Sequence, residues 1–366
     1  MGVKAVVMPG PRRPLEVREL PEPELEDGSV LLETVASEVC GTDVHLHHGR
    51  LSGVPYPIIP GHVSVGRVVE SRGVEADALG QELKAGHLVT FLDVHGTCHR
   101  CHYCRVARQP NLCPEREVYG ITLGANEGPF GGWAERIHLK PGVQVLRLPE
   151  GVDPERLIGG GCGLFTGFAA VERAEPAMGE TVLVQGAGPV GMAAAALARR
   201  RGAARVLVIG APDSRLELAR ALGAHETLSL EGTSPAERRQ RVHELTDGRG
   251  VDAAVEASGN PEALPEGLNL LRPGGRYVVA GHYTDAGGVE LNPHRHINRQ
   301  HADIRGQWGT DLHHLVGALR LLAREGDALP FERVVGRRYR LEDAGKALQD
   351  VEHLRVTKAV ISPTGQ

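Results

Sequence analysis

The sequence lacks the features that mark membrane, secreted and nucleic-acid-binding proteins. Its 366 residues carry a formal net charge of −5, so we expect no basic surface for nucleic acid or an anionic membrane. The longest apolar run, Val190 to Ala198, is far shorter than the roughly 20 residues of a membrane helix. The first residues show no apolar core followed by a small-residue cleavage site. These absences favour a cytoplasmic protein.

Cysteine is scarce, with six residues in the chain, yet four of the six fall in one short stretch. Disulfides at such spacing belong to short secreted chains, whereas four clustered thiolates can form the closed tetrahedral cage of a structural zinc. The absence of a basic, aromatic-rich surround disfavours a nucleic-acid-binding zinc ribbon. The four cysteines are Cys98, Cys101, Cys104 and Cys113. Three interleaved histidines could substitute as ligands: His95, His99 and His102.

The two remaining cysteines, Cys40 and Cys162, lie far apart in the sequence and both are next to glycines. His62, in Pro-Gly-His, is the best candidate for a nitrogen partner. Taken singly, these residues would more often be ordinary core residues. Flanking glycine lets the backbone bend tightly around an ion, which favours a second metal site with two sulfurs, one nitrogen and an open position.

A glycine-rich segment follows the apolar stretch Thr181–Gln185 and opens an alanine-rich run. It reads Gly186-Ala187-Gly188-Pro189-Val190-Gly191. In a strand–turn–helix context this Gly-x-Gly-x-x-Gly pattern predicts a dinucleotide site. The first glycine permits the turn, the second admits the pyrophosphate and the third allows the helix to pack on the strand.

The position that selects between NAD and NADP is unusual. An acidic residue normally follows the second strand and binds the ribose hydroxyls, but here Gly210 takes its place. Without a carboxylate at this position, the 2′-phosphate of NADP would not be repelled. Arg215 is the only nearby basic residue that could bind that phosphate. The sequence therefore predicts a nicotinamide dinucleotide and leaves NAD and NADP both open.

The predicted elements divide the chain into three segments. Residues 1–155 contain short strands separated by turns, with a zinc lobe at 95–113. Residues 156–295 alternate strands with helices, which predicts a parallel sheet covered on both faces. Residues 296–366 are too short for a domain and are expected to return to the first segment.

Together these motifs resemble the zinc-containing medium-chain dehydrogenase/reductase family, typified by alcohol dehydrogenases. The resemblance covers nearly the whole chain and implies a Rossmann doubly wound parallel sheet inserted in a GroES-like, mostly-β catalytic domain. It implies two zinc ions per subunit and a homodimer or homotetramer. By this resemblance Cys40, His62 and Cys162 hold the catalytic zinc, and the four clustered cysteines hold the structural zinc.

The resemblance also implies roles in catalysis. Thr42 matches the hydroxyl that takes the alcohol proton, His45 the proton exit to solvent, and Asp43 the carboxylate that orients the zinc-bound histidine. Thr166 matches a threonine that contacts the cofactor near the nicotinamide. The expected reaction is hydride transfer between a secondary alcohol, apolar or cyclic, and NAD(P), giving a ketone or aldehyde.

One residue departs from the family pattern. Relatives read Gly-His-Glu, whereas this chain reads Gly61-His62-Val63. The missing glutamate lies near the zinc in relatives and assists ligand exchange. Its loss keeps open an alternative, a zinc- and nucleotide-binding family member with little or no dehydrogenase activity.

Overall fold

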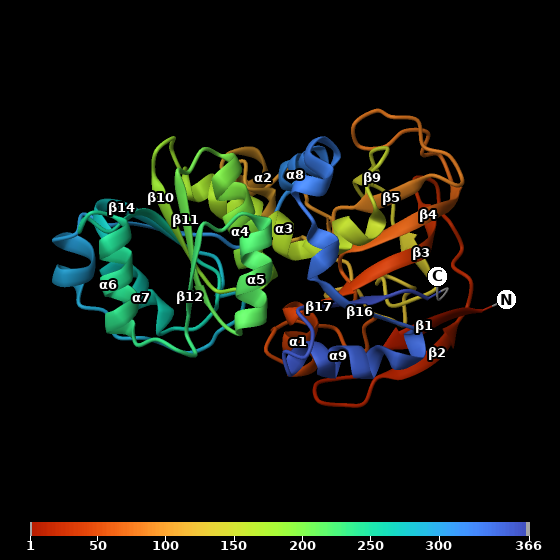
Figure 1. The fold of residues 1–366 in the computed structure, drawn as a ribbon. Helices are drawn as coiled ribbons and strands as arrows, with labels where there is room; N and C mark the ends of the chain where they lie inside the picture. The colour runs from red at the N-terminus through yellow and green to blue at the C-terminus, as the bar shows by residue number, and fades with distance from the viewer. Residues whose placement is uncertain (1, 364–366) are drawn as a thin grey trace. The chain divides into compact units, whose positions relative to one another are not determined.

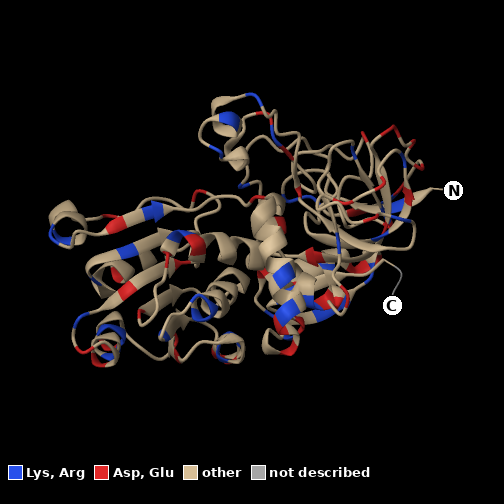
Figure 2. Cartoon of the chain, turned by 90° about the horizontal axis from the view of Figure 1, so that it is seen from above, with Lys and Arg blue, Asp and Glu red and all other residues tan. Residues whose placement is uncertain are grey.

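A computed structural model of the protein describes residues 2–363 and divides them into two compact units. Among the described residues, the first unit comprises residues 2–161, 309–326 and 331–363, and the second comprises residues 162–308 and 327–330. Both are drawn in Figure 1. Acidic and basic side chains are interspersed along both (Figure 2), in keeping with the small net charge. No helix within the described residues combines the length and the apolar character that a bilayer crossing demands.

The first unit is built on a sheet that brings the two ends of the chain together. Strand β3 (Val30–Val39) is central and pairs with β4 (Ser64–Ser71), with β8 (Arg136–Leu139) and with the last strand, β17 (Lys358–Ile361). The sheet continues through β5 (Leu88–Phe91) and β9 (Val145–Arg147) on one side and β16 (Val335–Tyr339) on the other. The C-terminal strand thus lies beside the residues that precede Cys40.

Smaller elements complete this unit. A core cluster joins β1 (Val3–Val7) to β3, β17 and helix α9 (Ala344–Glu352). The short strands β6 (Val94–His95) and β7 (Glu117–Val118) pair and bracket the cysteine lobe. The remaining named elements are β2 (Glu16–Leu20), α1 (Gly41–His47), α2 (His102–Arg105) and α8 (Leu312–Glu325).

The second unit is a six-stranded parallel sheet whose order is β12-β11-β10-β13-β14-β15. This is the 3-2-1-4-5-6 order of the Rossmann fold, so the predicted doubly wound sheet is confirmed. The strands are β10 (Thr181–Gln185), β11 (Arg205–Gly210), β12 (Glu226–Ser229), β13 (Val251–Glu256), β14 (Leu271–Val279) and β15 (Asp303–Gly306). The helices are α4 (Pro189–Arg200), α5 (Asp213–Leu222), α6 (Pro235–Leu245) and α7 (Ala263–Leu270).

Helix α3 (Pro154–Ala174) was not predicted from the sequence. Its glycines, Gly159 to Gly161 and Gly163, have the composition of a flexible joint rather than a helix. Its backbone leaves helical geometry at Gly161, where φ is 48° and ψ is −145°. Two helical segments therefore meet at a bend that only glycine adopts easily.

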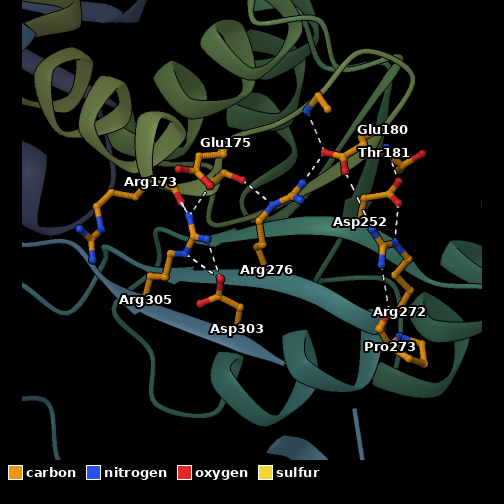
Figure 3. Close-up of polar contacts among 12 residues, drawn as sticks. Arg173, Glu175, Glu180, Thr181, Asp252, Arg272, Pro273, Arg276, Asp303 and Arg305 are labelled. Carbon is orange, nitrogen blue, oxygen red and sulfur yellow. Dashed lines mark hydrogen bonds and ion pairs between the residues drawn. The ribbon is translucent and has the colours of Figure 1, made fainter. Parts of the chain in front are cut away.

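Charged side chains tie together the amino ends of the parallel strands (Figure 3). Asp252 accepts the backbone N–H of Thr181 at 2.8 Å and pairs with Arg272 at 2.6 Å. On the outer strand, Arg305 pairs with Asp303 at 2.6 Å and with Glu175 at 2.8 Å. The network stabilises the edge of the sheet opposite to the glycine-rich loop Gly186–Gly191.

Candidate metal centre and dinucleotide site

The four clustered cysteines converge as the spacing predicted. Their sulfurs all lie within 4.8 Å of one another and the thiols are free. Two Sγ–Sγ distances are 3.6 Å (Cys98 to Cys113) and 4.0 Å (Cys101 to Cys113), far longer than a disulfide bond. With zinc–sulfur bonds near 2.3 Å, a tetrahedral cage has sulfurs about 3.8 Å apart. The lobe therefore has the dimensions of a closed zinc site, and the described residues place no histidine in the group.

Backbone N–H groups donate hydrogen bonds to two of these sulfurs, those of Cys98 and Cys113. The N–H of Cys101 donates to Cys98 Sγ at 3.3 Å, and the N–H of Cys98 donates to Cys113 Sγ at 3.4 Å. The pKa of Cys98 falls to about 6, chiefly because the N–H of Arg100 also donates to its sulfur. Thiolates are the form that metal ions bind.

Cys40 lies at the junction between β3 and helix α1, where it is the N-cap residue. Its N–H donates to Asp43 Oδ2 at 2.8 Å, and the N–H of Thr42 donates to its sulfur at 3.4 Å. The sulfur thus lies at the N-terminus of a short helix. The carboxylate of Asp43 fixes the backbone of Cys40 at this position.

His62 is presented by a turn that requires glycine before it. Gly61 has φ +90°, and a Cβ there would lie 2.5 Å from Ser37 Oγ and from a carbon of Trp133. His62 is 4% exposed. Cys162 is the residue bonded to Gly161, at the start of the second unit. The ligand atoms of Cys40, His62 and Cys162 lie within 4.8 Å of one another, and those of Glu38 lie there too.

Two buried polar atoms in this group have no hydrogen-bond partner among the described residues. They are His62 Nδ1 and Asp43 Oδ1. Burial raises the pKa of Asp43 to about 6, although the charge of His62 opposes the shift. Burial would lower the pKa of His62, but the charges of Cys40, Glu38 and Asp43 together raise it to about 9. A divalent cation would balance the negative charges that surround His62. Two cysteine sulfurs and one imidazole nitrogen are a ligand set that suits zinc.

Helix α1 presents two faces with different residues. Asp43 and Leu46, three positions apart, are both 0% exposed. Thr42 and His45, also three positions apart, are partly exposed on the other side. His45 Nδ1 lies 3.5 Å from an Arg50 nitrogen, and the pKa of His45 is lowered by partial burial and by that cation. His45 is therefore predominantly neutral, and able to accept a proton, near pH 7.

The three glycines of the dinucleotide motif meet three different surroundings. Gly186 has φ +112°, and a Cβ there would meet the backbone of Ala257 at 2.8 Å. A Cβ on Gly191 would overlap the carbonyl oxygen of Gly186. A Cβ on Gly188 would meet nothing within 4 Å, at the N-cap of α4. Gly188 thus leaves open space where a phosphate can approach the helix N-terminus.

Steric crowding explains the absent acidic residue at Gly210. A Cβ at this position would lie 2.6 Å from the Cβ of Ala187 and 2.8 Å from its backbone nitrogen. No larger residue fits without displacing the glycine-rich loop. Arg215 is in the first turn of α5, where burial lowers its pKa.

Further glycines place Thr166 near the same loop. Gly163 and Gly167 flank it on α3, and a Cβ on either would lie 2.7 Å from the Cβ of Pro189 or Ala193 respectively. The close packing of α3 on α4 brings partly exposed Thr166 to the start of α4. A cavity of about 1110 Å³ is lined largely by α6 and α7 and reaches Gln185, Gly186 and Ile209 at the carboxyl ends of β10 and β11. Such crevices are where open α/β sheets bind ligands.

Comparison with known proteins agrees with this geometry. The alcohol dehydrogenase GroES-like domain model matches residues 26–150, and the zinc-binding dehydrogenase model matches residues 189–324. The chain is 35% identical to the 5-exo-hydroxycamphor dehydrogenase of Pseudomonas putida over 99% of both chains. The chain belongs to the zinc-containing medium-chain dehydrogenase/reductase family. The predicted family and the GroES-like domain are confirmed, and the chain is an oxidoreductase of this family.

Two further relatives span the whole chain. The L-threonine 3-dehydrogenase of Streptomyces avermitilis is 31% identical over 99% of this chain and 100% of its own. A crystal structure of an alcohol dehydrogenase from Thermotoga maritima superposes with a TM-score of 0.94, at 36% identity and 99% coverage of both chains. This medium-chain dehydrogenase therefore has relatives named for both apolar and polar alcohols.

Three residues near the metal group were not found from the sequence. Glu38 is fully buried, Lys358 is fully buried, and Asp93 follows strand β5. Burial raises the pKa of Asp93, and the charge of His62 acts against the shift. No local motif marks these residues, because strand pairing alone brings them to the group.

Proposed function

We propose that this medium-chain dehydrogenase reversibly oxidises a secondary alcohol to a ketone, with hydride transfer to NAD(P), and that it binds two zinc ions per chain. The observation that supports this most is the convergence of the ligand atoms of Cys40, His62 and Cys162, which lie within 4.8 Å of one another. Zinc held there would act as a Lewis acid toward the alcohol. A nicotinamide dinucleotide on the Gly186–Gly191 loop would receive the hydride.

The protein residues carry the proton. The hydroxyl of Thr42 accepts the alcohol proton, and neutral His45 passes it to solvent. Asp43 caps helix α1 through the N–H of Cys40. By the family resemblance its carboxylate would also orient the imidazole of His62. Arg215 would bind a 2′-phosphate, so both NAD and NADP are candidates. The resemblance also supports a homodimer or homotetramer in the cytoplasm.

An apolar cyclic alcohol is the proposed substrate class. The 5-exo-hydroxycamphor dehydrogenase is 35% identical, and hydroxycamphor is a bicyclic secondary alcohol. The threonine dehydrogenase is 31% identical, and its substrate is charged and polar. An assay should therefore compare borneol-like alcohols, simple secondary alcohols and L-threonine.

The test is absorbance at 340 nm with zinc-loaded protein, both cofactors and this alcohol panel. Turnover should be highest with cyclic secondary alcohols and should fall about 100-fold or more in Thr42→Val, which lacks the proton acceptor. Cofactor binding without turnover of any alcohol or carbonyl would refute the proposal. It would favour instead a zinc- and nucleotide-binding protein without dehydrogenase activity.

A further inference from the structure

Glu38 and Lys358 form an ion pair inside the first unit, and both are 0% exposed. Lys358 Nζ donates to Glu38 Oε2 at 2.6 Å and to the carbonyl oxygen of Gly160 at 3.2 Å. Desolvation of two charges offsets most of their attraction, so such a pair contributes little net stability. The position of this pair points to another role.

The second oxygen of Glu38 is directed at the metal group. Oε1 lies 3.3 Å from His62 Nε2, and Glu38 is one of the four residues whose ligand atoms lie within 4.8 Å of one another. The carboxylate is thus divided between an ammonium on one side and the proposed zinc ligands on the other. A carboxylate oxygen is itself a good zinc ligand.

Glu38 also occupies the place next to the residue that departs from the family pattern. Its N–H donates to the carbonyl oxygen of Val63 at 3.1 Å, so the two residues are neighbours across β3 and the start of β4. Val63 is 3% exposed and has no polar atom in its side chain. The carboxylate that relatives carry at the position of Val63 is therefore replaced by the carboxylate of Glu38 on the adjacent strand β3.

We propose that Glu38 is an additional, exchangeable ligand of the catalytic metal. Lys358 binds the Glu38 carboxylate when it is not a metal ligand. This inference rests on the metal site of the proposed function. With zinc bound and no substrate present, the Glu38 carboxylate would fill the open coordination position. With an alcohol bound, Glu38 would pair with Lys358 alone, so that the buried carboxylate keeps a charged partner.

Opposite effects of two substitutions test this role. In the zinc-loaded enzyme, Glu38→Gln should speed zinc transfer from this site to a chromogenic chelator by about 10- to 100-fold, since the amide is a poor ligand. Lys358→Met should slow the transfer and lower kcat, because the released carboxylate remains on the metal. If the ion pair were purely structural, its removal would speed zinc release in both variants. That result would overturn the inference.

Two controls make the comparison specific. The closed four-cysteine lobe serves as the slow internal reference for zinc release. Asp350→Asn removes a buried carboxylate that accepts the Tyr339 hydroxyl at 2.6 Å, outside the metal group, and should leave release from the Cys40 site unchanged. A similar acceleration in Asp350→Asn would overturn the inference, because general loosening would then explain the result.

A rescue variant avoids dependence on Lys358→Met folding. In the Glu38→Gln background, Val63→Glu returns a carboxylate to the neighbouring strand and should restore slow zinc release. Release that stays fast would contradict the inference. Wild-type protein that holds no zinc and has no turnover refutes the proposed function, whereas an active zinc enzyme in which Glu38→Gln releases zinc at the wild-type rate refutes only the role of Glu38.

Discussion

Gly188→Ala should abolish cofactor binding while leaving the protein as stable as before. The added methyl group meets no protein atom within 4 Å and points into the space assigned to the pyrophosphate. Its backbone, φ −81° and ψ 177°, is accessible to alanine. Reduced freedom of the unfolded chain stabilises by about 0.4–1 kcal/mol, and the poorer alanine N-cap costs about the same. The free energy of unfolding should therefore change by less than about 0.5 kcal/mol.

Gly191→Ala, three residues later, should instead lower the stability of the protein. Here a Cβ would overlap the Gly186 carbonyl oxygen. Alanine gains about 1 kcal/mol in helix propensity, but overpacking against backbone costs about 1–3 kcal/mol or more. We expect a net loss of about 2 kcal/mol in the free energy of unfolding.

Urea unfolding of the cofactor-free protein and calorimetric titration with NAD and NADP measure the two effects separately. In Gly188→Ala the dissociation constant should rise at least 100-fold with an unchanged unfolding midpoint. In Gly191→Ala the midpoint should fall. If Gly188→Ala binds either cofactor as the wild type does, the assignment of this loop to the pyrophosphate is wrong.

Three other substitutions probe separate parts of the molecule. Cys113→Ser should remove one zinc per chain, measured by metal analysis, and lower the melting temperature, because the cage loses one of four ligands. Arg50→Met should raise the pKa of His45, because a cation near the imidazole is lost; oxidation needs neutral His45, so the acid limb of the pH–kcat profile should move to higher pH. Arg272→Met should destabilise by about 1–3 kcal/mol at pH 7, measured by urea unfolding. Burial would raise the pKa of Asp252, but the N–H of Thr181 and the side chain of Arg272 hold it below the ordinary aspartate value of 3.8, so this contribution is present above that pH, and the difference from wild type should shrink as pH falls below it.

Residues whose function depends on local chemistry were predictable from the sequence. The four-cysteine spacing fixes a cage within one loop, and the glycine motif acts through steric limits on its own backbone. The four sulfurs lie within 4.8 Å of one another, and a Cβ at Gly188 would meet open space. Cys40 and Asp43 also form a capping box, a pattern with a short-range signature.

Residues that depend on strand pairing were not predictable. Glu38 and Lys358 are 320 positions apart and meet because β17 pairs with β3. Neither has a neighbouring motif, and a charged residue in a strand ordinarily indicates an exposed face. Helix α3 was missed for a different reason. Its glycines favour a loop locally, but two of them, Gly163 and Gly167, are required for the close packing of α3 on α4.

The pairing of the last strand with β3 has a consequence for how the protein acquires its metals during synthesis. The cysteine lobe lies within residues 98–113 and can close around an ion soon after that stretch leaves the ribosome. Glu38 has no Lys358 beside it until β17 has been made, long after the cysteine lobe. An ion at the cysteine lobe would therefore bind early in synthesis, whereas the complete charge arrangement around Glu38 forms only after β17 has left the ribosome.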